Sequence, residues 1–408
     1  MGIYRLNSSI QNYEWGSTSA IAECLGRAPS AEPEAELWMG AHAKCPSPLV
    51  QPFDGIRDLR QLIASAPDET LGEKIAARCG RLPFLFKILA AARPLSLQAH
   101  PSSSQAKEGF EREEASQIPI DASERNYVDS HHKPEMIFAL SDFYALSGFR
   151  SPSACLEMIE AYRFEQTHPS LQRLCLEFRS TPTVFGMETL FRGIFALDAQ
   201  ERRKAISALS AVLTEASLPP EAEKFLPWFL QLSKMYPSDP GVLASVLLHF
   251  VHLSAGDAMS LPAGNLHAYL DGLALEIMAS SDNVLRGGLT KKHVDVEELC
   301  RILSFESFMP EIGKGCAQTL TRQSELRVFE TEAAEFELSI LSIADEVALD
   351  VHGPEIWLAL EGSLHLKTDK ESVQLSRGQQ VFISPSQAMR LEGKGRIARA
   401  AVSRSLFA

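Results

Sequence analysis

The stretch that says most about the fold is Gly256-Asp-Ala-Met-Ser-Leu-Pro-Ala-Gly-Asn-Leu-His-Ala-Tyr-Leu-Asp271. Within it, Gly256, Pro262, Gly264 and His267 follow the spacing G-x5-P-x-G-x2-H. A Pro-x-Gly turn between two strands places the following histidine at the mouth of the second strand. We therefore expect His267 to face the interior of a β-barrel, where an imidazole is a common metal ligand.

A second stretch, Leu95-Ser-Leu-Gln-Ala-His-Pro101, contains two more candidate ligands. Alternate residues of a strand share a face, so Gln98 and His100 point the same way, opposite to Leu97 and Ala99. Two polar side chains on one face of an apolar strand are expected where that face meets a metal ion. The alternative interpretation is that both are hydrogen-bonded residues of the core.

A carboxylate, Glu135, follows in His132-Lys-Pro-Glu-Met136, at the entry of a further expected strand. Pro134 is tolerated there because the start of a strand can lack one backbone donor. These segments together offer nitrogen and oxygen ligands with one negative charge, a set that suits zinc and also manganese, iron or cobalt. The candidate ligand set is Gln98, His100, Glu135 and His267.

Composition limits the class of protein. The 408 residues are 45% hydrophobic and 22% charged, which fits a soluble globular protein of two or three domains. A net charge of −13 argues against nucleic acid or an anionic membrane as a partner. The seven cysteines are widely spaced without a CxxC motif, as in reduced cytosolic proteins. Neither a signal-peptide pattern nor a membrane-length apolar run is present, so we expect a cytoplasmic protein.

The order of the expected elements is β, then α, then β. Apolar residues recur at helical spacing between 151 and 251, for example Ile206, Leu209 and Leu213. Short blocks with turn residues between them run from 335 to 402, as in a β-sandwich or barrel. We predict a mainly β fold with an α-helical insert. The expected domains are a discontinuous β domain at 1–150 and 252–325, a helical domain at 151–251, and a metal-free β domain at 326–408.

The spacing that ends at His267 resembles the second sequence motif of cupins, a double-sheet jelly-roll class, and Gln98-x-His100 with Glu135 resembles the first. Longer blocks extend the likeness to nearly the whole chain. They resemble the type I phosphomannose isomerases and lie at residues 11–16, 35–40, 82–87, 95–101, 132–136, 146–150, 262–270 and 276–290.

This resemblance implies an enzyme with one Zn²⁺ per chain; separately, we expect a monomeric, cytoplasmic protein. Such an enzyme interconverts mannose 6-phosphate and fructose 6-phosphate through an enediol, feeding mannose metabolism and GDP-mannose synthesis. The implied fold is a cupin jelly-roll catalytic domain, a helical domain and a second cupin-like domain. The metal ligands of the family fall on Gln98, His100, Glu135 and His267, and its proposed catalytic and substrate-contacting residues fall on His132, Lys133, Glu276, Asp282 and Arg286.

The residue types suit this chemistry. Moving a proton between C1 and C2 needs a base, a group that stabilises negative charge on oxygen, and a grip on the phosphate. Lys133 and Arg286 are candidates for holding the phosphate or the enediolate, with surface ion pairing as the alternative. The base is either Glu276 or His132, and Asp282 is a further candidate that alternatively only positions Arg286.

Ser102 and Lys107, just after the Gln-x-His strand, are further candidates for binding the phosphate. The alternative is that they lie on a surface helix. Two other functions are compatible with a metal-bound cupin: sugar binding without catalysis, and metal-dependent oxygenation. The presence of Gln98 among the ligands argues against an oxygenase, since that chemistry usually needs a histidine-rich iron site.

Overall fold

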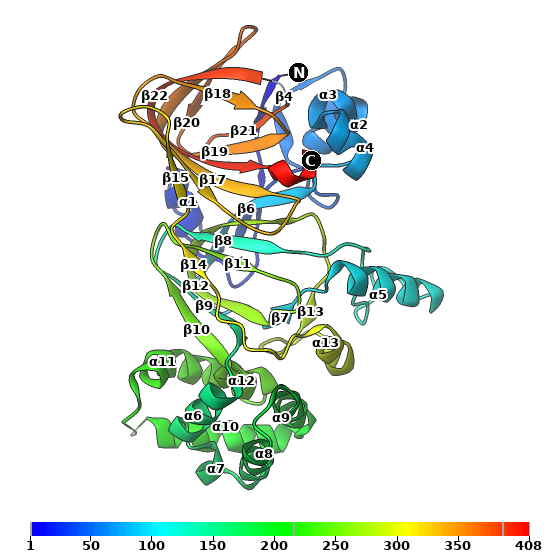
Figure 1. The fold of residues 1–408 in the computed structure, drawn as a ribbon, viewed down its shortest axis with the longest axis vertical. Coiled ribbons are helices and arrows are strands. Elements are labelled where there is room, and N and C mark those ends of the chain that lie inside the picture. Colours follow the sequence, from blue (N-terminus) through cyan, green and yellow to red (C-terminus); the bar gives the residue numbers. More distant parts are fainter. Residues whose placement is uncertain (1, 215–216, 386, 408) are drawn as a thin grey trace.

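The computed structural model describes residues 2–214, 217–385 and 387–407. It confirms a mainly β fold with a helical middle region (Figure 1). The strands are β1 Ile3–Leu6, β2 Ser9–Gln11, β3 Glu36–Met39, β4 Pro48–Phe53, β5 Ile56–Asp58, β6 Phe84–Ala91, β7 Gln98–Ala99, β8 Glu135–Ala139, β9 Phe143–Phe149, β10 Leu248–Leu253, β11 Ala258–Leu261, β12 His267–Ala279, β13 Leu285–Arg286, β14 Ile312–Gly313, β15 Cys316–Thr319, β16 Glu325–Phe329, β17 Glu337–Ile343, β18 Val347–Val351, β19 Glu355–Lys367, β20 Ser372–Ser376, β21 Gln380–Ile383 and β22 Gln387–Ala401. The α-helices are α1 Ala20–Cys24, α2 Leu59–Ser65, α3 Pro67–Leu71, α4 Glu73–Cys79, α5 Ser103–Ala115, α6 Pro152–Ala161, α7 Phe164–Thr167, α8 Pro169–Ser180, α9 Val184–Ala196, α10 Ala199–Leu213, α11 Pro220–Met235, α12 Pro240–Ala244 and α13 Val296–Ile302. Two short 3₁₀ helices follow the same naming: η1 Ser245–Leu247 and η2 Arg404–Phe407.

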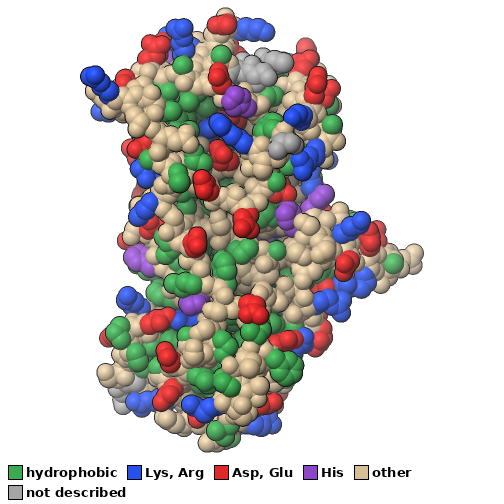
Figure 2. All heavy atoms as spheres, viewed as in Figure 1, with side chains coloured by type: hydrophobic (Ala, Val, Ile, Leu, Met, Phe, Trp, Pro, Cys, Tyr) green, Lys and Arg blue, Asp and Glu red, His purple; other side chains and the backbone are tan. Residues whose placement is uncertain are grey.

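The surface carries charges of both signs. On the face shown in Figure 2, Lys and Arg side chains are dispersed among Asp and Glu. Among the described helices, none has the length and apolar character that crossing a bilayer requires.

The central β region has two layers that share one strand. Layer A has the order β14-β11-β8-β12-β6-β3-β2, and layer B has the order β13-β7-β12-β9-β10; all these pairings are antiparallel. The first part of β12 pairs with β7 and β9, and its second part pairs with β6 and β8. The two layers are therefore the two walls of one jelly roll.

Strand β12 bends where it passes from layer B to layer A. Its pairing with β9 shifts by one residue between Tyr269 and Asp271, which marks a β-bulge, and Gly272 follows with φ of 121°. A bulge changes which residues face a given side of the sheet. After it, Ala274 packs beside Tyr269 in the core between the layers, whereas Leu275 faces the opposite core. Glu276 therefore shares the inner side with Tyr269.

Layer A is buried on both faces. Along β6, Leu89 and Ala91 pack between the layers, whereas Phe86 and Ile88 pack against the C-terminal sheet. Burial of both faces explains why β6 is an almost unbroken apolar run instead of an alternating one. Strand β6 pairs with β3 and β12.

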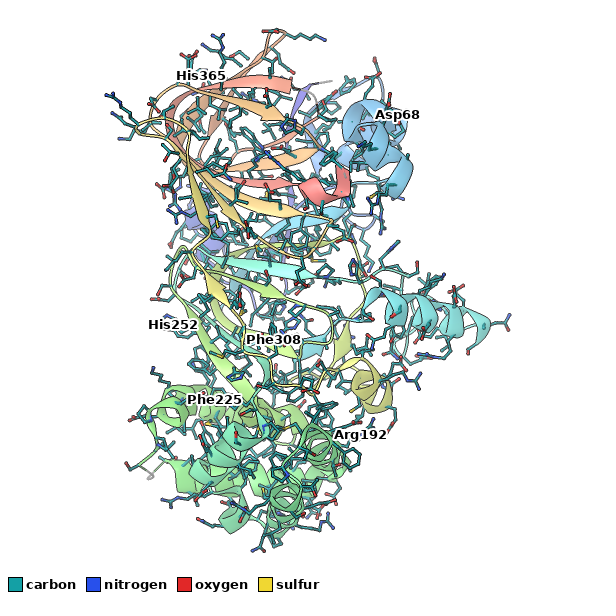
Figure 3. The ribbon with its side chains drawn as sticks, viewed as in Figure 1. Asp68, Arg192, Phe225, His252, Phe308 and His365 are labelled. Carbon is teal, nitrogen blue, oxygen red and sulfur yellow. The ribbon has the colours of Figure 1, made fainter. Side chains whose placement is uncertain are left out.

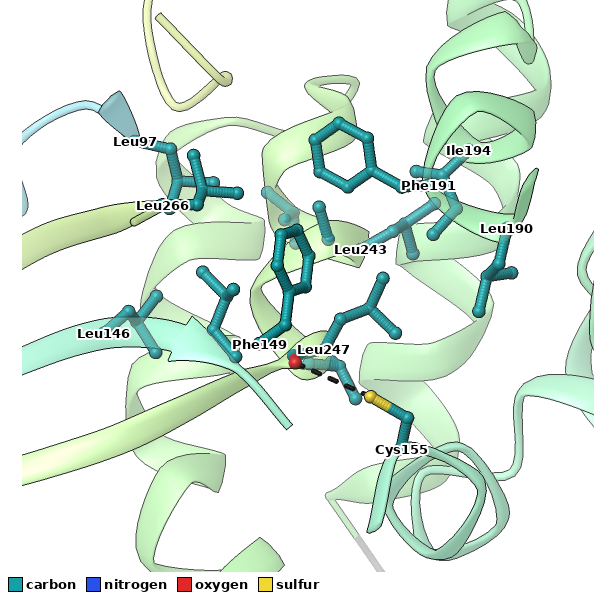
Figure 4. Packing of buried hydrophobic residues seen from close by; sticks show 14 of the residues in the cluster. Leu97, Leu146, Phe149, Cys155, Leu190, Phe191, Ile194, Leu243, Leu247 and Leu266 are labelled. Atoms are coloured by element: carbon teal, nitrogen blue, oxygen red, sulfur yellow. Dashed lines mark hydrogen bonds between the residues drawn. The ribbon is translucent and has the colours of Figure 1, made fainter. Parts of the chain in front are cut away.

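The helical middle region closes the far side of layer B (Figure 3), where Phe225 of α11 lies 5.7 Å from Phe250 of β10 between ring centroids. Phe149 at the end of β9 contacts Phe191 of α9 edge-on at 5.8 Å. In Figure 4 the rings of Phe149 and Phe191 lie among leucines from both parts, and the thiol of Cys155 donates to the carbonyl of Leu247 at 3.6 Å. One apolar cluster therefore holds the helices against the jelly roll.

The C-terminal sheet includes strands from the start of the chain. Its order is β15-β16-β17-β22-β19-β21-β1-β4-β5, with β18 against β22 and β20 against β19. Ile3 pairs with Ile383, so the first strand completes a sheet built almost 400 residues later. The sequence placed residues 1–150 wholly in the first β domain. The domain boundaries themselves stay a prediction.

The bend of β12 yields a test of stability. A Cβ at Gly272 would lie 2.5 Å from the carbonyl oxygen of Asp142. We expect Gly272→Ala to lower the free energy of unfolding by about 2–5 kcal/mol, through backbone strain and overlap together. Gly55→Ala is the matched control, since Gly55 also has a positive φ, of 82°, but nothing lies within 4 Å. Gly55→Ala should lower the free energy of unfolding, measured in urea, by only about 1–2 kcal/mol. Equal losses in the two variants would contradict the close approach at β12.

Candidate active site

Three buried side chains meet between the layers. His100 follows β7, Glu135 begins β8 and His267 begins β12, and one ligand atom from each lies within 4.8 Å of the other two. The Nε2 of His100 is 3.3 Å from one oxygen of Glu135, and the Nε2 of His267 is 3.5 Å from the other. Gln98 completes the cluster, with its amide nitrogen 3.3 Å from the Nε2 of His267.

Both imidazoles are oriented by backbone carbonyls. The Nδ1 of His100 lies 2.7 Å from the carbonyl oxygen of Asn283, and the Nδ1 of His267 lies 3.0 Å from that of Asn265. A carbonyl oxygen only accepts, so each Nδ1 carries the proton and each Nε2 directs a lone pair at Glu135. This arrangement of an outer hydrogen bond and an inner lone pair is typical of metal-binding histidines.

These residues fit a divalent metal. Ligands about 2.0–2.1 Å from a tetrahedral zinc lie about 3.3–3.4 Å from one another, close to the spacings between Glu135 and the two imidazoles. The buried Nε2 of His100 has no hydrogen-bond partner within the described chain, as expected of an atom that binds a metal. Rotating the amide of Gln98 presents its oxygen instead of its nitrogen.

Charge at the site is locally balanced. The ammonium of Lys133 lies 3.1 Å from Glu135. Burial alone would raise the pKa of Glu135, but the attraction of the Lys133 ammonium holds it well below its ordinary value. Burial also lowers the pKa of His100 to about 4, so its imidazole is neutral at physiological pH. Both ligands are therefore in the protonation state that metal binding needs.

A second charged cluster lies beside the first on layer A. Lys87 of β6 is directly opposite Glu276 of β12, with Nζ 2.7 Å from the carboxylate, and it is 3.3 Å from Glu36 of β3. Burial would lower the pKa of Lys87, but the attraction of Glu276 and Glu36 raises it. The pKa of Glu276 is raised, chiefly by burial. Lys87 is therefore a firmly protonated donor next to a carboxylate of increased basicity.

Both clusters border one cavity of about 470 Å³. We call Gln98, His100, Glu135 and His267 the metal cluster, and Lys87, Glu276 and Glu36 the charged cluster. Gln98 and Glu135 line the cavity from the metal cluster, and Lys87 and Glu276 line it from the charged cluster. Tyr269 lies between them, with its hydroxyl 3.5 Å from Glu135. The volume is adequate for a sugar phosphate, at the small end of ordinary ligand sites.

The cavity also contains cations without acidic partners. Arg286 of β13 pairs across the strand with Gln98, so the two side chains share a face. Within the described residues, no hydrogen bond or ion pair holds the Arg286 side chain, and burial lowers its pKa. Burial lowers the pKa of Lys292, and the nearby charge of Arg286 lowers it further. Neither Arg286 nor Lys292 has a carboxylate partner within the described residues, and such cations in a cavity favour an anionic ligand group.

Other residues proposed from the sequence lie elsewhere. His132 is paired with Glu335 at 2.6 Å and borders another cavity, of about 750 Å³, next to the C-terminal sheet; Glu135 lines this cavity as well. Asp282 is held by His42 at 3.2 Å and Lys44 at 2.8 Å beside a third cavity of about 600 Å³. Burial would raise the pKa of Asp282, but these two hydrogen bonds lower it.

The two phosphate candidates on the following helix do not line the metal-side cavity. Ser102 is the N-cap of α5 and forms a capping box with Gln105. Lys107 lies on the exposed side of the same helix, which projects from the molecule (Figure 1). The structure therefore brings together Gln98, His100, Lys133, Glu135, His267, Glu276 and Arg286, and leaves His132, Asp282, Ser102 and Lys107 outside this cavity.

Sequence reasoning gave no role to several lining residues, among them Lys87, Glu36, Tyr269 and Lys292. One signal was available for Lys87: it is a lone charge in the apolar run Phe84–Ala91, and a buried charge needs a partner. No comparable signal marks Glu36, which reaches the cavity through the pairing of β3 with β6, or Lys292, which lies in the loop after β13.

Known proteins share this architecture. The family described as phosphomannose isomerase type I, catalytic domain, matches residues 3–152. Mannose-6-phosphate isomerase of Escherichia coli K12 is 37% identical over 403 residues, covering 97% of this chain and 98% of that protein. The human enzyme of the same name is 30% identical, covering 96% and 95%.

Solved structures agree. A crystal structure of mannose 6-phosphate isomerase with zinc bound superposes with a TM-score of 0.86 at 35% identity, covering 98% of this chain and 99% of that one. A phosphomannose isomerase structure from Salmonella typhimurium gives a TM-score of 0.87 at 34% identity, with the same coverage. The chain belongs to the type I phosphomannose isomerase family.

Proposed function

We propose that this protein is a zinc-dependent mannose-6-phosphate isomerase, interconverting mannose 6-phosphate and fructose 6-phosphate. The observation that carries the proposal is one cavity bordered by a histidine–carboxylate metal cluster, a buried Lys87–Glu276 pair and unpaired cations. Full-length similarity to enzymes of that name supports the same conclusion.

Gln98, His100, Glu135 and His267 are the residues that hold zinc in this proposal. When bound, zinc supplies a Lewis acid that polarises oxygen atoms of the substrate. Two histidines and one carboxylate would also suit a non-haem iron oxygenase. The isomerase is favoured because the Lys87–Glu276 pair and the cations at Arg286 match the needs of a phosphosugar enediol reaction.

Glu276 is the proposed base. Its side chain borders the cavity and its burial increases its basicity, whereas His132 is engaged with Glu335 outside that cavity. Glu276 takes the proton from C2 of the open-chain sugar and returns it to C1, while a proton passes from the C2 hydroxyl to the C1 oxygen, so that the aldehyde becomes the ketone. The reverse reaction runs through the same enediol. Lys87 and Lys133 are placed to donate to the oxygens on which negative charge develops.

Arg286 and Lys292 are the proposed phosphate site. A guanidinium binds phosphate through paired hydrogen bonds, and here no protein carboxylate in the described chain competes for it. This assignment puts the phosphate at one end of the cavity and the reacting carbons beside Glu276. Roles for His132, Asp282, Ser102 and Lys107 stay predictions.

We also propose a cytoplasmic location, which the seven free thiols favour. The monomeric state stays a prediction. Placement in mannose metabolism and GDP-mannose synthesis follows from the proposed reaction.

Metal removal tests the role of the ligand cluster. Protein dialysed against a chelator should lose isomerase activity and regain it with zinc, because the polarising cation is then restored. Glu135→Gln should need far more zinc for the same rate, since a neutral amide replaces the anionic ligand. Conversion of mannose 6-phosphate in a coupled assay measures both. Full activity in verified metal-free protein would contradict the metal role, and oxygen uptake by iron-loaded protein would favour an oxygenase.

Replacing the base tests the proton transfer. Glu276→Gln should lower kcat by about 10²–10⁴-fold, the usual contribution of a positioned general base, with zinc content unchanged. Asp271→Asn is the control, because Asp271 lies on the same strand but not in the cavity lining. Its kcat should match that of the wild type. If His132→Gln abolishes turnover and Glu276→Gln retains it, the base is His132 and not Glu276.

Substituting the cations separates two phosphate sites. Arg286→Met should raise KM for mannose 6-phosphate by about 10- to 100-fold, the loss expected for hydrogen bonds to a charged group. Lys107→Met tests the helix site and should leave KM unchanged if the phosphate binds at Arg286. Steady-state kinetics give both values. A raised KM in Lys107→Met alone would place the phosphate at the start of α5.

A further inference from the structure

The segment 280–284 connects β12 to β13, and one of its backbone carbonyl oxygens contacts the metal cluster. The carbonyl oxygen of Asn283 accepts the hydrogen bond from the Nδ1 of His100, 183 positions away in sequence. Asn283 is fully buried. The carbonyl that orients His267 belongs to Asn265, only two residues away, so His100 alone depends on a distant segment for its orientation.

Both the nitrogen and the oxygen of the Asn283 side-chain amide form hydrogen bonds. Its nitrogen donates to the carbonyls of Asp129 and His131 at 2.7 and 2.9 Å. Its oxygen accepts from the backbone N–H groups of Val128 and Asp129 at 2.8 and 3.2 Å. Among side chains of this length, only an amide offers two donors and an acceptor with two lone pairs. Asn283 therefore fixes the backbone of residues 128–131.

The carboxylate of Asp129 ties the two segments together from the other side. It accepts from the hydroxyl of Ser281 at 2.9 Å and from the N–H groups of Asp282 and His131, both at 2.9 Å. The hydroxyl of Ser281 is in turn 3.2 Å from the N–H of Asn283. Residues 128–131 and 281–283 thus form one hydrogen-bonded unit.

This unit connects two metal ligands that lie on different layers. The main chain of Asn283 holds His100, which follows β7 of layer B. Its side chain holds the segment that leads directly into Lys133 and Glu135 of layer A. A shift of Asn283 would therefore change the 3.3 Å separation between His100 and Glu135.

We propose that Asn283 is a positioning residue for the metal, and that Asp129 and Ser281 hold it in place. This inference rests on the proposed zinc role of His100 and Glu135. According to this proposal, zinc affinity depends on Asn283, Asp129 and Ser281, although none of these residues binds the ion. Loss of an outer hydrogen-bond partner of a metal ligand typically weakens binding by about 10–100-fold.

Asn283→Asp is the sharpest test, because it keeps the shape of the side chain. A carboxylate has no donor, so it would face two carbonyl oxygens and the charge of Asp129 without a hydrogen bond. Zinc dissociation constants, measured by competition with a chromophoric chelator, should rise about 10–100-fold. The same chelator curve on wild-type protein sets the reference.

Asn126→Asp is the matched control. Asn126 lies in the same loop and donates to Asp295 at 3.0 Å, so its replacement places two carboxylates together and strains the loop away from the metal. It should lower the Tm of the metal-free protein but leave the zinc dissociation constant unchanged. Equal weakening of zinc binding in Asn126→Asp and Asn283→Asp would show general loop damage and overturn the proposal.

Ser281→Ala is a milder second variant if Asn283→Asp does not fold. It removes one bond to Asp129 and the acceptor for the N–H of Asn283, and should raise the zinc dissociation constant by a smaller factor. If folded Asn283→Asp binds zinc as tightly as the wild type, the inference is overturned and the proposed function stays intact. The same holds for Ser281→Ala where that is the variant tested. Wild-type protein that binds no zinc overturns both.

Discussion

Strand β12 passes once from layer B to layer A, and the geometry of the site depends on that bend. The bulge before Gly272 changes which side of the sheet the following residues face. As a result, His267 and Tyr269 on one side of the bend and Glu276 on the other all face the same interior. A straight strand with unbroken alternation would direct Glu276 at the C-terminal sheet, away from Lys87.

The neighbouring strands of β12 then place the other functional groups by simple pairing. Gln98 and Ser147 lie opposite His267, and Lys87 lies opposite Glu276. Each of the three buried carboxylates in these two clusters has a cation within 3.3 Å: Lys133 for Glu135, and Lys87 for both Glu276 and Glu36. Burying these charges is tolerable because they are paired. Arg286 and Lys292 line the same cavity and have no such carboxylate partner within the described residues.

The sequence was most informative where a chemical requirement left a local pattern. The Pro-x-Gly turn before His267 and the Gln98-x-His100 alternation were sufficient to predict that these three side chains meet, and helical periodicity was sufficient to predict the helical middle region. Contacts between distant strands left no such pattern. The pairing of Ile3 with Ile383 and the contact of Glu36 with Lys87 depend on tertiary packing, which no local window contains.

The same limit explains the residues that lie outside the cavity. His132 is adjacent in sequence to Lys133, but successive residues point in opposite directions in extended chain, and His132 meets Glu335 instead. Asp282 is near Arg286 in sequence, yet it is held by His42 and Lys44. Spacing along the chain places such residues near a site without saying which cavity they enter.

A crystal structure of the zinc-loaded protein with mannose 6-phosphate would test the central claim most directly. The account predicts an anomalous zinc peak between the Nε2 atoms of His100 and His267 and the carboxylate of Glu135. It also predicts the phosphate beside Arg286, with C1 and C2 of the sugar next to Glu276. A zinc peak elsewhere, or a phosphate bound at Ser102 and Lys107 with the sugar outside this cavity, would contradict it.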